Sequence, residues 1–428
     1  MNRYFITTRC LYILTVLSAA CSDQLTGTFF KPQYPHQRYQ RKLETAGLGR
    51  SVLYRQWFEA AVQSLADPAV VTVPYQEAAY IPADRPRAIG YFFQAKEGER
   101  LYIEAAVQPA DSAQLFIDLF EAPRDTSSDL RHLVSADTMT TQLTWDVRRD
   151  GQYLLRVQPE LLASISFQLR ITAEPSLANP VAPGAAQHIG SIFGDARDGG
   201  SRAHEGIDIF AARLTPVLAA TDGRVTRVGN NRLGGKVVWL RPADGRPINL
   251  YYAHLDTQLV TPGQAVRAGD TLGLIGNTGN ARTTPPHLHL GIYGPNGAVD
   301  PLPFIRPGKS TPPPIQADMT RNGDTLRITA DLRGNVSTGT PAVVEATAGK
   351  GYRIVLPNGI KRSVNHTQTT RLTALRTMKL ARERILYAEA DTTKPQITRL
   401  SAGQQVGLLG QYGQFLLVST PVRGWILR

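Results

Sequence analysis

Cysteine is almost absent from this chain of 428 residues, which contains only Cys10 and Cys21. Cys10 lies in an N-terminal segment with the pattern of a cleavable signal, so the mature chain keeps one cysteine and forms no internal disulfide. Long apolar runs are missing too. Nothing after the N-terminal segment reaches the roughly 18 uninterrupted apolar residues that a membrane-spanning helix needs. We therefore expect neither an internal disulfide nor a second membrane anchor.

Acidic residues are in the minority, with 35 Asp and Glu against 47 Lys and Arg, for a formal net charge of +12. Removal of Arg3 and Arg9 with the signal lowers the charge by two, to +10. A basic protein concentrates anionic partners at its surface, and the bacterial cell wall is such a partner. The charges are scattered, and no basic run is interleaved with aromatic residues as a nucleic-acid surface would require. We therefore expect no nucleic-acid partner.

The N-terminal segment, residues 1–20, has the order of a secretory signal: basic residues, an apolar run at 11–17, and the small residues Ser18, Ala19 and Ala20. The junction resembles a bacterial lipoprotein signal, in which Cys21 becomes the lipidated first residue, although Ser18 stands where Leu is common. Ordinary cleavage after Ala20 also fits these small residues. We favour a lipid on Cys21 as membrane anchor, because no structural need explains a solitary cysteine there. The expected location is the periplasm or the outer membrane, after export across the inner membrane.

The length and a hydrophobic content of 42% predict two to four domains. Residues 21–70 are expected to be helical, because Leu53, Trp57, Ala61 and Leu65 follow helical spacing. Residues 71–175 change to a period of two and predict a β-sandwich. Its alternating stretches begin at Leu101, Tyr153 and Phe167. This pattern resembles the prepeptidase-type sandwich found beside secreted bacterial peptidases.

Glycine-rich turns and short strands are predicted for residues 186–305. A proline-rich stretch at 306–317 is typical of an extended linker. Residues 318–428 again have a β pattern with hairpin signals. The end of the chain, from Gly403 through Phe415 to Trp425, resembles a bacterial SH3 domain, and a more divergent copy is expected around 338–364. Such modules hold cell-wall peptides or serve as spacers, and both interpretations stay open here.

Three short motifs between residues 202 and 290 carry chemistry. They read Arg-Ala-His-Glu-Gly-Ile-Asp-Ile at 202–209, Tyr-Tyr-Ala-His-Leu at 251–255 and Pro-Pro-His-Leu-His-Leu at 285–290. In the last motif, two histidines two apart on a strand project from the same face into one cleft. Imidazole and carboxylate are zinc ligands, and a catalytic zinc uses three protein ligands and an open fourth position. His204, Asp208 and one histidine of the pair would fill the three positions.

The first motif superficially matches the helical zincin pattern, with Asp208 in the place of the second histidine. Gly206 followed by Ile207, Asp208 and Ile209 is poor helix sequence, so we expect a loop that runs into a strand. Glu205 then does not act as the zincin general base, because that role depends on helical placement. The chain has no Gly-x-Ser-x-Gly motif, and serine or cysteine nucleophiles have no candidate.

The segment closely resembles the M23 (lysostaphin-like) zinc metallopeptidases. The family pattern runs from a Phe-Gly turn through Arg-x-His-x-Gly-x-Asp, Tyr-x-His-Leu and a Thr-Gly turn to His-Leu-His. All of its parts are present, at residues 193–194, 202–208, 252–255, 277–279 and 287–289. The resemblance covers about 120 of the 428 residues and its combination of motifs is highly specific. Leu290-Gly291 replaces the Phe-Glu of many members, which touches no expected ligand.

This resemblance implies that His204, Asp208 and His289 bind Zn²⁺, while His254 and His287 stay unliganded and catalytic. Zinc can lower the pKa of bound water to about 7, and two free imidazoles can supply hydrogen bonds and acid–base function. Which of the two imidazoles takes the proton stays open. The implied activity is that of a metalloendopeptidase that hydrolyses peptide bonds in peptidoglycan.

The expected fold is mainly β: an antiparallel β-sheet metallopeptidase domain, an N-terminal helical segment and β-sandwich, and C-terminal SH3-like β-barrel domains. Two other functions stay open. The first is a non-enzymatic M23-fold regulator that activates another wall hydrolase, although relatives of that kind lack zinc ligands. The second is a zinc peptidase that acts on glycine-rich proteins.

Overall fold

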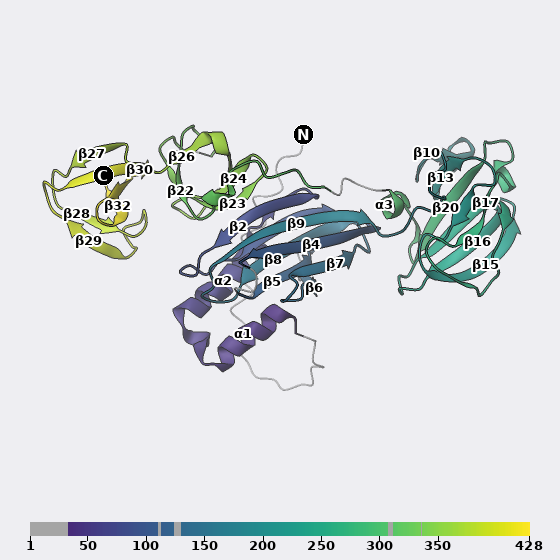
Figure 1. Ribbon diagram of the computed structural model, residues 1–428, viewed down its shortest axis with the longest axis horizontal. Coiled ribbons are helices and arrows are strands. Elements are labelled where there is room, and N and C mark those ends of the chain that lie inside the picture. The colour runs from purple at the N-terminus through teal and green to yellow at the C-terminus, as the bar shows by residue number, and fades with distance from the viewer. Residues whose placement is uncertain (1–32, 110–112, 124–129, 307–310, 335) are drawn as a thin grey trace.

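The structure is a computed structural model that describes residues 33–109, 113–123, 130–306, 311–334 and 336–428. The predicted signal, Cys21 and part of the predicted linker lie outside these residues. Figure 1 shows four β-rich modules in a row, with the sandwich and its helices near the centre. The mainly β, antiparallel architecture is confirmed. Across the described ranges, no helix has both the length and the apolar character needed to cross a membrane.

Two helices open the described chain, α1 (Pro35–Thr45) and α2 (Val52–Ala66), joined by the short 3₁₀ turn η2 (Leu48–Arg50). Ser51 caps α2, because its side chain accepts a hydrogen bond from the backbone N–H of Tyr54 at 3.1 Å. The helices pack through Trp57, which is 1% exposed and donates its indole N–H to the carbonyl of Pro159 at 2.9 Å. Trp57 also packs on Phe116, so the helices cover one outer face of the sandwich.

The sandwich consists of two sheets around one core. The first sheet has the order β1-β3-β8-β5-β6, and the second contains β2-β9-β4-β7. Leu101, Tyr153 and Phe167, predicted to begin alternating stretches, lie in β4, β8 and β9 and are all buried in the shared core. The strands are β1 (Ala69–Val70), β2 (Tyr75–Ile81), β3 (Ile89–Ala95), β4 (Glu99–Gln108), β5 (Leu115–Glu121), β6 (Arg131–Ser135), β7 (Gln142–Asp146), β8 (Gly151–Pro159) and β9 (Ile165–Pro175).

The second β-rich module along the chain, formed by β10–β21, contains the three motifs. Its main path has the order β10-β13-β20-β17-β16-β15-β18, and β14, β19 and β21 pair beside it. The strands are β10 (Gln187–Ser191), β13 (Ile207–Ala211), β14 (Pro216–Leu218), β15 (Gly223–Asn231), β16 (Gly235–Pro242), β17 (Asn249–Gln258), β18 (Ala265–Val266), β19 (Thr271–Ile275), β20 (His287–Gly294) and β21 (Gly297–Val299). Aliphatic side chains with almost no exposure fill one core, so the sheet that carries the motifs is a firm support.

Short elements complete this module. The small hairpin of β11 (Ala196–Arg197) and β12 (Arg202–Ala203) surrounds η3 (Asp198–Gly200), and η4 (Gly279–Ala281) precedes β20. Helix α3 (Leu302–Ile305) closes the module against the sandwich. Phe304 is 2% exposed, and its carbonyl accepts a hydrogen bond from the N–H of Leu177 at 2.9 Å. A Cβ at Gly98 would lie 2.3 Å from the ring of Phe304, so this close approach requires glycine.

The segment after the linker joins the sandwich directly. Its strands are β22 (Thr325–Ile328), β23 (Pro341–Ala348), β24 (Gly351–Val355), β25 (Lys361–Asn365) and β26 (Thr369–Arg371), with η5 (Met319–Arg321) and η6 (His366–Gln368). Strand β23 pairs with β2, so the second sandwich sheet grows to nine strands. A module that the sequence presents as separate is therefore continuous with the sandwich.

The last module is a six-stranded sheet of order β27-β30-β31-β32-β28-β29. The strands are β27 (Arg376–Lys379), β28 (Arg384–Tyr387), β29 (Gln396–Leu400), β30 (Gln405–Tyr412), β31 (Phe415–Ser419) and β32 (Arg423–Leu427). Trp425 and its apolar neighbours form a cluster of their own on this sheet. The pairing of the described strands does not close into a barrel, so the SH3-like assignment stays a prediction.

Candidate metal centre

The three motifs meet in one groove of about 760 Å³ on the module of β10–β21. His204 lies in the loop before β13, Asp208 on β13, His254 on β17, and His287 and His289 on β20. The expected loop that runs into a strand is confirmed, since β13 begins at Ile207. Strands β13 and β17 both pair with β20, so motifs far apart in the sequence become neighbours.

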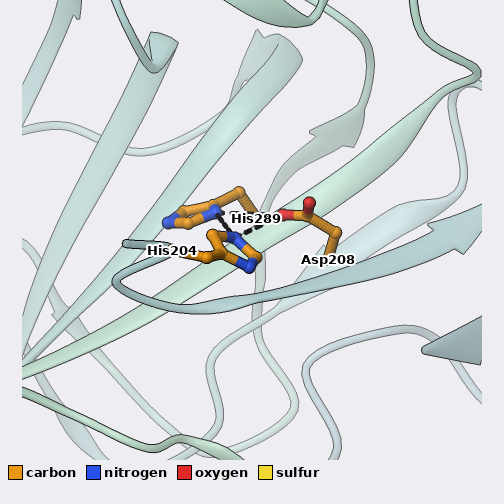
Figure 2. A group of neighbouring side chains, drawn as sticks. All are labelled: His204, Asp208 and His289. Carbon is orange, nitrogen blue, oxygen red and sulfur yellow. Dashed lines mark hydrogen bonds and ion pairs between the residues drawn. The ribbon is translucent and has the colours of Figure 1, made fainter. Parts of the chain in front are cut away.

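His204, Asp208 and His289 converge on one point (Figure 2). The Nε2 atom of His204 lies 2.9 Å from Nδ1 of His289 and 3.1 Å from Oδ1 of Asp208. The third distance, from His289 Nδ1 to Asp208 Oδ1, is 3.0 Å. Atoms bound at about 2.1 Å to one tetrahedral zinc ion lie roughly 3.4 Å apart, so a shared ion needs these atoms to move apart by only a few tenths of an ångström.

The backbone fixes which nitrogen of His204 faces this point. Its Nδ1 lies 2.9 Å from the carbonyl oxygen of Ile192, and a carbonyl can only accept, so Nδ1 carries the proton. In the neutral ring, Nε2 then presents a lone pair toward Asp208 Oδ1, which is also an acceptor. A proton on His289 can satisfy only part of this set. The three converging atoms therefore suit a cation, which all of their lone pairs can coordinate.

Asp208 is held as a carboxylate. Burial pushes its pKa upward, but the neighbouring imidazoles of His204 and His289 outweigh burial and place the pKa well below its ordinary value. The outer oxygen, Oδ2, accepts a hydrogen bond from Nη2 of Arg197 at 2.7 Å. Arg197 also donates to the hydroxyl of Ser191 at 2.7 Å, so this arginine orients the carboxylate from behind.

His254 and His287 flank the same point without belonging to the group of three. Nδ1 of His254 donates to the carbonyl of Thr278 at 2.9 Å, and Nδ1 of His287 donates to that of Pro285 at 2.8 Å. Both rings therefore keep Nε2 for the groove, with their centroids 4.9 Å apart. Burial, then the neighbouring His289 and His287, lower the pKa of His254 to about 4, so this ring is neutral at neutral pH.

Two local features of the backbone shape the site. A Cβ at Gly206 would lie 2.7 Å from the imidazole of His289 and 2.5 Å from the carbonyl oxygen of Leu290, which explains the glycine between His204 and Asp208. His254 has a φ of 61°, a left-handed conformation that is uncommon for a residue with a Cβ. Such strain persists only where the surroundings impose it, and it is concentrated at functional sites.

Sequence analysis did not identify the wall of the groove. Trp239 and Tyr251 are cross-strand partners on β16 and β17 with ring centroids 4.6 Å apart, and Tyr293 lies 5.3 Å from Trp239. Glu205, which we expected not to act as a zincin base, accepts a hydrogen bond from the hydroxyl of Tyr293 at 3.2 Å. These aromatic residues lie on paired strands, β16, β17 and β20. Their proximity could have been predicted from the sequence only if the register between these strands had been known.

The remaining histidines lie outside this group. His36 bonds Gln158 at 2.6 Å, His132 bonds Ser135 at 2.8 Å, and His366 bonds the carbonyl of Lys350 at 2.8 Å. His188 stacks on Phe210 beside the groove, with centroids 5.4 Å apart. None of these four residues belongs to the group of His204, Asp208 and His289.

Comparison with known proteins points to one family. The model of peptidase family M23 matches residues 202–301. Over 128 residues the chain is 40% identical to the L-Ala–D-Glu endopeptidase of Bacillus subtilis (strain 168), which covers 27% of this chain and 39% of that protein. It is also 34% identical over 111 residues to the murein hydrolase activator NlpD of Escherichia coli (strain K12), covering 26% and 27%. The chain therefore spans well under half of either relative.

Among solved structures, the catalytic domain of the antimicrobial peptidase lysostaphin from Staphylococcus simulans matches with 32% identity and a TM-score of 0.25. The match covers 28% of this chain and 91% of that domain. The matched family segment begins at Arg202 and includes every residue of the three motifs. Residues 202–301 therefore form a domain of peptidase family M23.

Proposed function

We propose that this chain is a zinc-dependent endopeptidase that hydrolyses peptide bonds in peptidoglycan, in stem peptides or cross-links. The observation that carries the proposal is the meeting of His204, Asp208 and His289 in an open groove beside two further imidazoles. Family M23 membership of residues 202–301 supports a peptidase. The name of one relative gives a bond between L-Ala and D-Glu, and that of another gives murein, which supports a wall substrate.

His204, Asp208 and His289 would hold Zn²⁺ through Nε2, Oδ1 and Nδ1. A zinc ion supplies a water of lowered pKa and polarises the carbonyl that is attacked. The chain prepares these three atoms before any ligand arrives: the carbonyl of Ile192 fixes the tautomer of His204, and Arg197 orients Asp208. Both contacts reduce the rearrangement that binding would require.

His254 and His287 would manage the protons. Each donates Nδ1–H to a backbone carbonyl, so each ring presents Nε2 to the groove in a fixed orientation. A neutral imidazole can take a proton from the attacking water and return it to the leaving amine, and it can donate a hydrogen bond once protonated. The lowered pKa of His254 keeps this ring available as a base at neutral pH. We propose that the two rings share this work.

The groove would hold an extended peptide. Trp239, Tyr251 and Tyr293 line one side and offer apolar contact area beside the five polar groups of the site. Gly234 leaves space next to Tyr251, since a Cβ there would lie 1.9 Å from the tyrosine hydroxyl. Closely packed aromatic residues on one side of an open groove suit an extended peptide with small side chains.

Purified full-length protein incubated with bacterial sacculi tests the proposal. We expect soluble muropeptides that vanish with chelator and return when zinc is added. Intact sacculi with wild-type protein and with the His289→Ala variant alike would reject an enzyme. Release of muropeptides only when a separate wall hydrolase is present would instead identify a regulator, the function that the similarity to NlpD suggests. Cleavage of glycine-rich proteins with intact sacculi would identify the third alternative.

For location, we propose the cell envelope, with a lipid on Cys21 as the anchor. The murein hydrolase activator among the relatives supports an extracytoplasmic place of action. Radiolabelled palmitate tests the anchor: the wild-type chain should incorporate label, and a Cys21→Ser variant should not. Label in neither protein would favour ordinary cleavage after Ala20.

A further inference from the structure

A second groove, of about 360 Å³, lies where three modules meet far from the candidate metal centre. The loop before β3 contributes Arg85 and Arg87, the hairpin of β24 and β25 contributes Leu356, and the last module contributes Arg423 and Trp425. Figure 1 shows the module of β22–β26 between the sandwich and the last module. The volume lies within the range of small-ligand sites. The groove exists only because the modules pack together.

Positively charged side chains outnumber carboxylates beside this groove. Two buried carboxylates, Glu77 and Glu345, are 0% and 3% exposed. Arg353 pairs with both, through Nη1 to Glu77 at 2.6 Å and Nε to Glu345 at 2.7 Å, and Lys361 takes the remaining oxygen of Glu345 at 3.3 Å. The oxygens of both carboxylates are therefore occupied before Arg87 is considered.

Arg87 is left as a half-buried cation without an acceptor. No carboxylate among the described residues lies within ion-pair distance of its guanidinium, and no hydrogen bond stabilises it. Arg85 and Arg423, both exposed, add two further cations to the lining. The one carboxylate of the lining, Glu389, pairs with Lys394 at 3.6 Å. No buried side-chain nitrogen or oxygen of the described residues lacks a partner, so the unbonded guanidinium of Arg87 reaches the solvent of the groove, where its five N–H donors are available to an anionic ligand.

We propose that this groove binds a carboxylate of an acidic peptide, with Arg87 as the principal contact and Arg85 and Arg423 as its flanks. Guanidinium groups bind carboxylates through two parallel hydrogen bonds, which suits a planar acceptor. The apolar lining, which includes Pro341 and Trp425, favours a ligand with apolar surface next to its charge over a free hydrated anion. As an acidic peptide we take one containing L-Ala and D-Glu, a choice that rests on the proposed function.

Isothermal titration calorimetry of the full chain tests this proposal. The probe is the acetylated dipeptide L-Ala-D-Glu, and the protein carries His289→Ala so that the probe is not cleaved. We expect one-to-one binding that weakens roughly 10- to 100-fold in Arg87→Gln, the range for loss of a charged hydrogen bond. Arg423→Gln, at an exposed position, should weaken binding less and guards against a folding defect in the first variant.

The matched control is Arg382→Gln, an exposed arginine of the last module outside the lining, which should bind like the parent protein. A dipeptide with both carboxylates amidated should not bind, and inorganic phosphate should bind more weakly than the acidic peptide. Equal affinity of Arg87→Gln and Arg382→Gln, or of the acid and its diamide, overturns the proposal. Phosphate binding as tight as peptide binding does so too. Hydrolysis of sacculi is a separate readout, so failure of the proposed function is distinguishable from failure here.

Discussion

Two groups of charged side chains in this molecule solve opposite problems. At the junction of sandwich and β22–β26, Arg353 binds both oxygens of Glu77, at 2.6 and 2.8 Å, and the hydroxyl of Tyr75 donates to the same carboxylate at 2.5 Å. Every acceptor meets a donor, and the cluster is closed. At the candidate metal centre, His204 Nε2 and Asp208 Oδ1 lie 3.1 Å apart with both in acceptor roles. That cluster is complete only with a cation.

Whether every donor and acceptor has a partner distinguishes a structural cluster from a ligand site. A balanced buried cluster indicates a joint, because breaking one partner leaves an uncompensated charge. A group of converging acceptors indicates a ligand that the chain does not itself provide. Exposure alone does not separate the two, since Asp208 is 7% exposed and Glu345 is 3% exposed.

The largest effect is expected from His289→Ala. Loss of one of three ligand atoms removes the metal, so zinc content should fall from one ion per chain to none and hydrolysis of sacculi by more than about 10³-fold. Metal analysis and muropeptide release measure the two quantities. The matched control is His188→Ala, which removes an exposed imidazole beside the groove that stacks on Phe210. Zinc retained by His289→Ala at full stoichiometry would contradict the ligand assignment.

The next effect separates ligands from proton carriers. His254→Ala should keep one zinc per chain, because its Nε2 is not among the converging atoms, while turnover falls by about 10²- to 10⁴-fold. His287→Ala should behave in the same manner. The two measurements are again metal content and muropeptide release. A zinc-free His254→Ala protein would show that this imidazole is a ligand and that the group of three is wrongly chosen.

A substitution in the buried cluster of Arg353, Glu77 and Glu345 should lower stability and leave zinc binding unchanged. Arg353→Met leaves Glu77 and Glu345 buried without their main partner and should lower the free energy of unfolding by about 3 to 5 kcal/mol. Zinc content should not change, since the cluster lies outside the module of β10–β21 that holds the candidate metal centre. Urea unfolding measures the loss. The control is Arg399→Met, which breaks the exposed pair with Glu383 and should cost at most about 1 kcal/mol. Equal losses in both variants would deny that the junction depends on a buried charge pair.

The sequence predicts the site better than the arrangement of modules. The spacing of His204 and Asp208 around a required glycine, and the alternation of His287 and His289, are local signals that survive without a structure. Alternation predicts strands such as β4 and β9 because one face of each is buried. Such signals depend only on residues close together in the sequence, so they can be recognised before the fold is known.

What sequence analysis misses is set by contacts over long sequence separations. The carbonyl of Ile192 orients His204, and a carbonyl carries no residue-specific signal. The pairing of β2 with β23 joins residues about 270 positions apart, and either strand would also suit another edge. Arg353 at this junction looks like an ordinary charged residue of a hairpin until Glu77 is placed beside it. Register and module packing therefore had to come from the structure.

A buried histidine outside the site, His36, has a partner for its ring N–H within the chain. His36 is 2% exposed, and its Nε2 lies 2.6 Å from Oε1 of Gln158, an acceptor that the chain supplies. Burial, followed by the charge of Arg156, lowers its pKa from 6.5 to about 4, although Asp118 opposes the shift. The folded protein therefore keeps His36 neutral where the unfolded chain already binds a proton. Its contribution to stability is complete above pH 6.5 and is lost as the pH falls toward 4.

Between pH 7 and pH 5 this residue should account for a loss of about 2 kcal/mol in the free energy of unfolding. His36→Gln keeps an N–H donor for Gln158 but does not titrate, so its unfolding free energy should fall by about 2 kcal/mol less over the same range. Urea unfolding at the two pH values gives the difference. His366→Gln is the matched control, because His366 is exposed and bonds a backbone carbonyl. Parallel pH dependence of wild type and His36→Gln would mean that the protonated imidazole is accommodated within the fold. The balance of donors and acceptors would then predict ligands less reliably than the two clusters suggest.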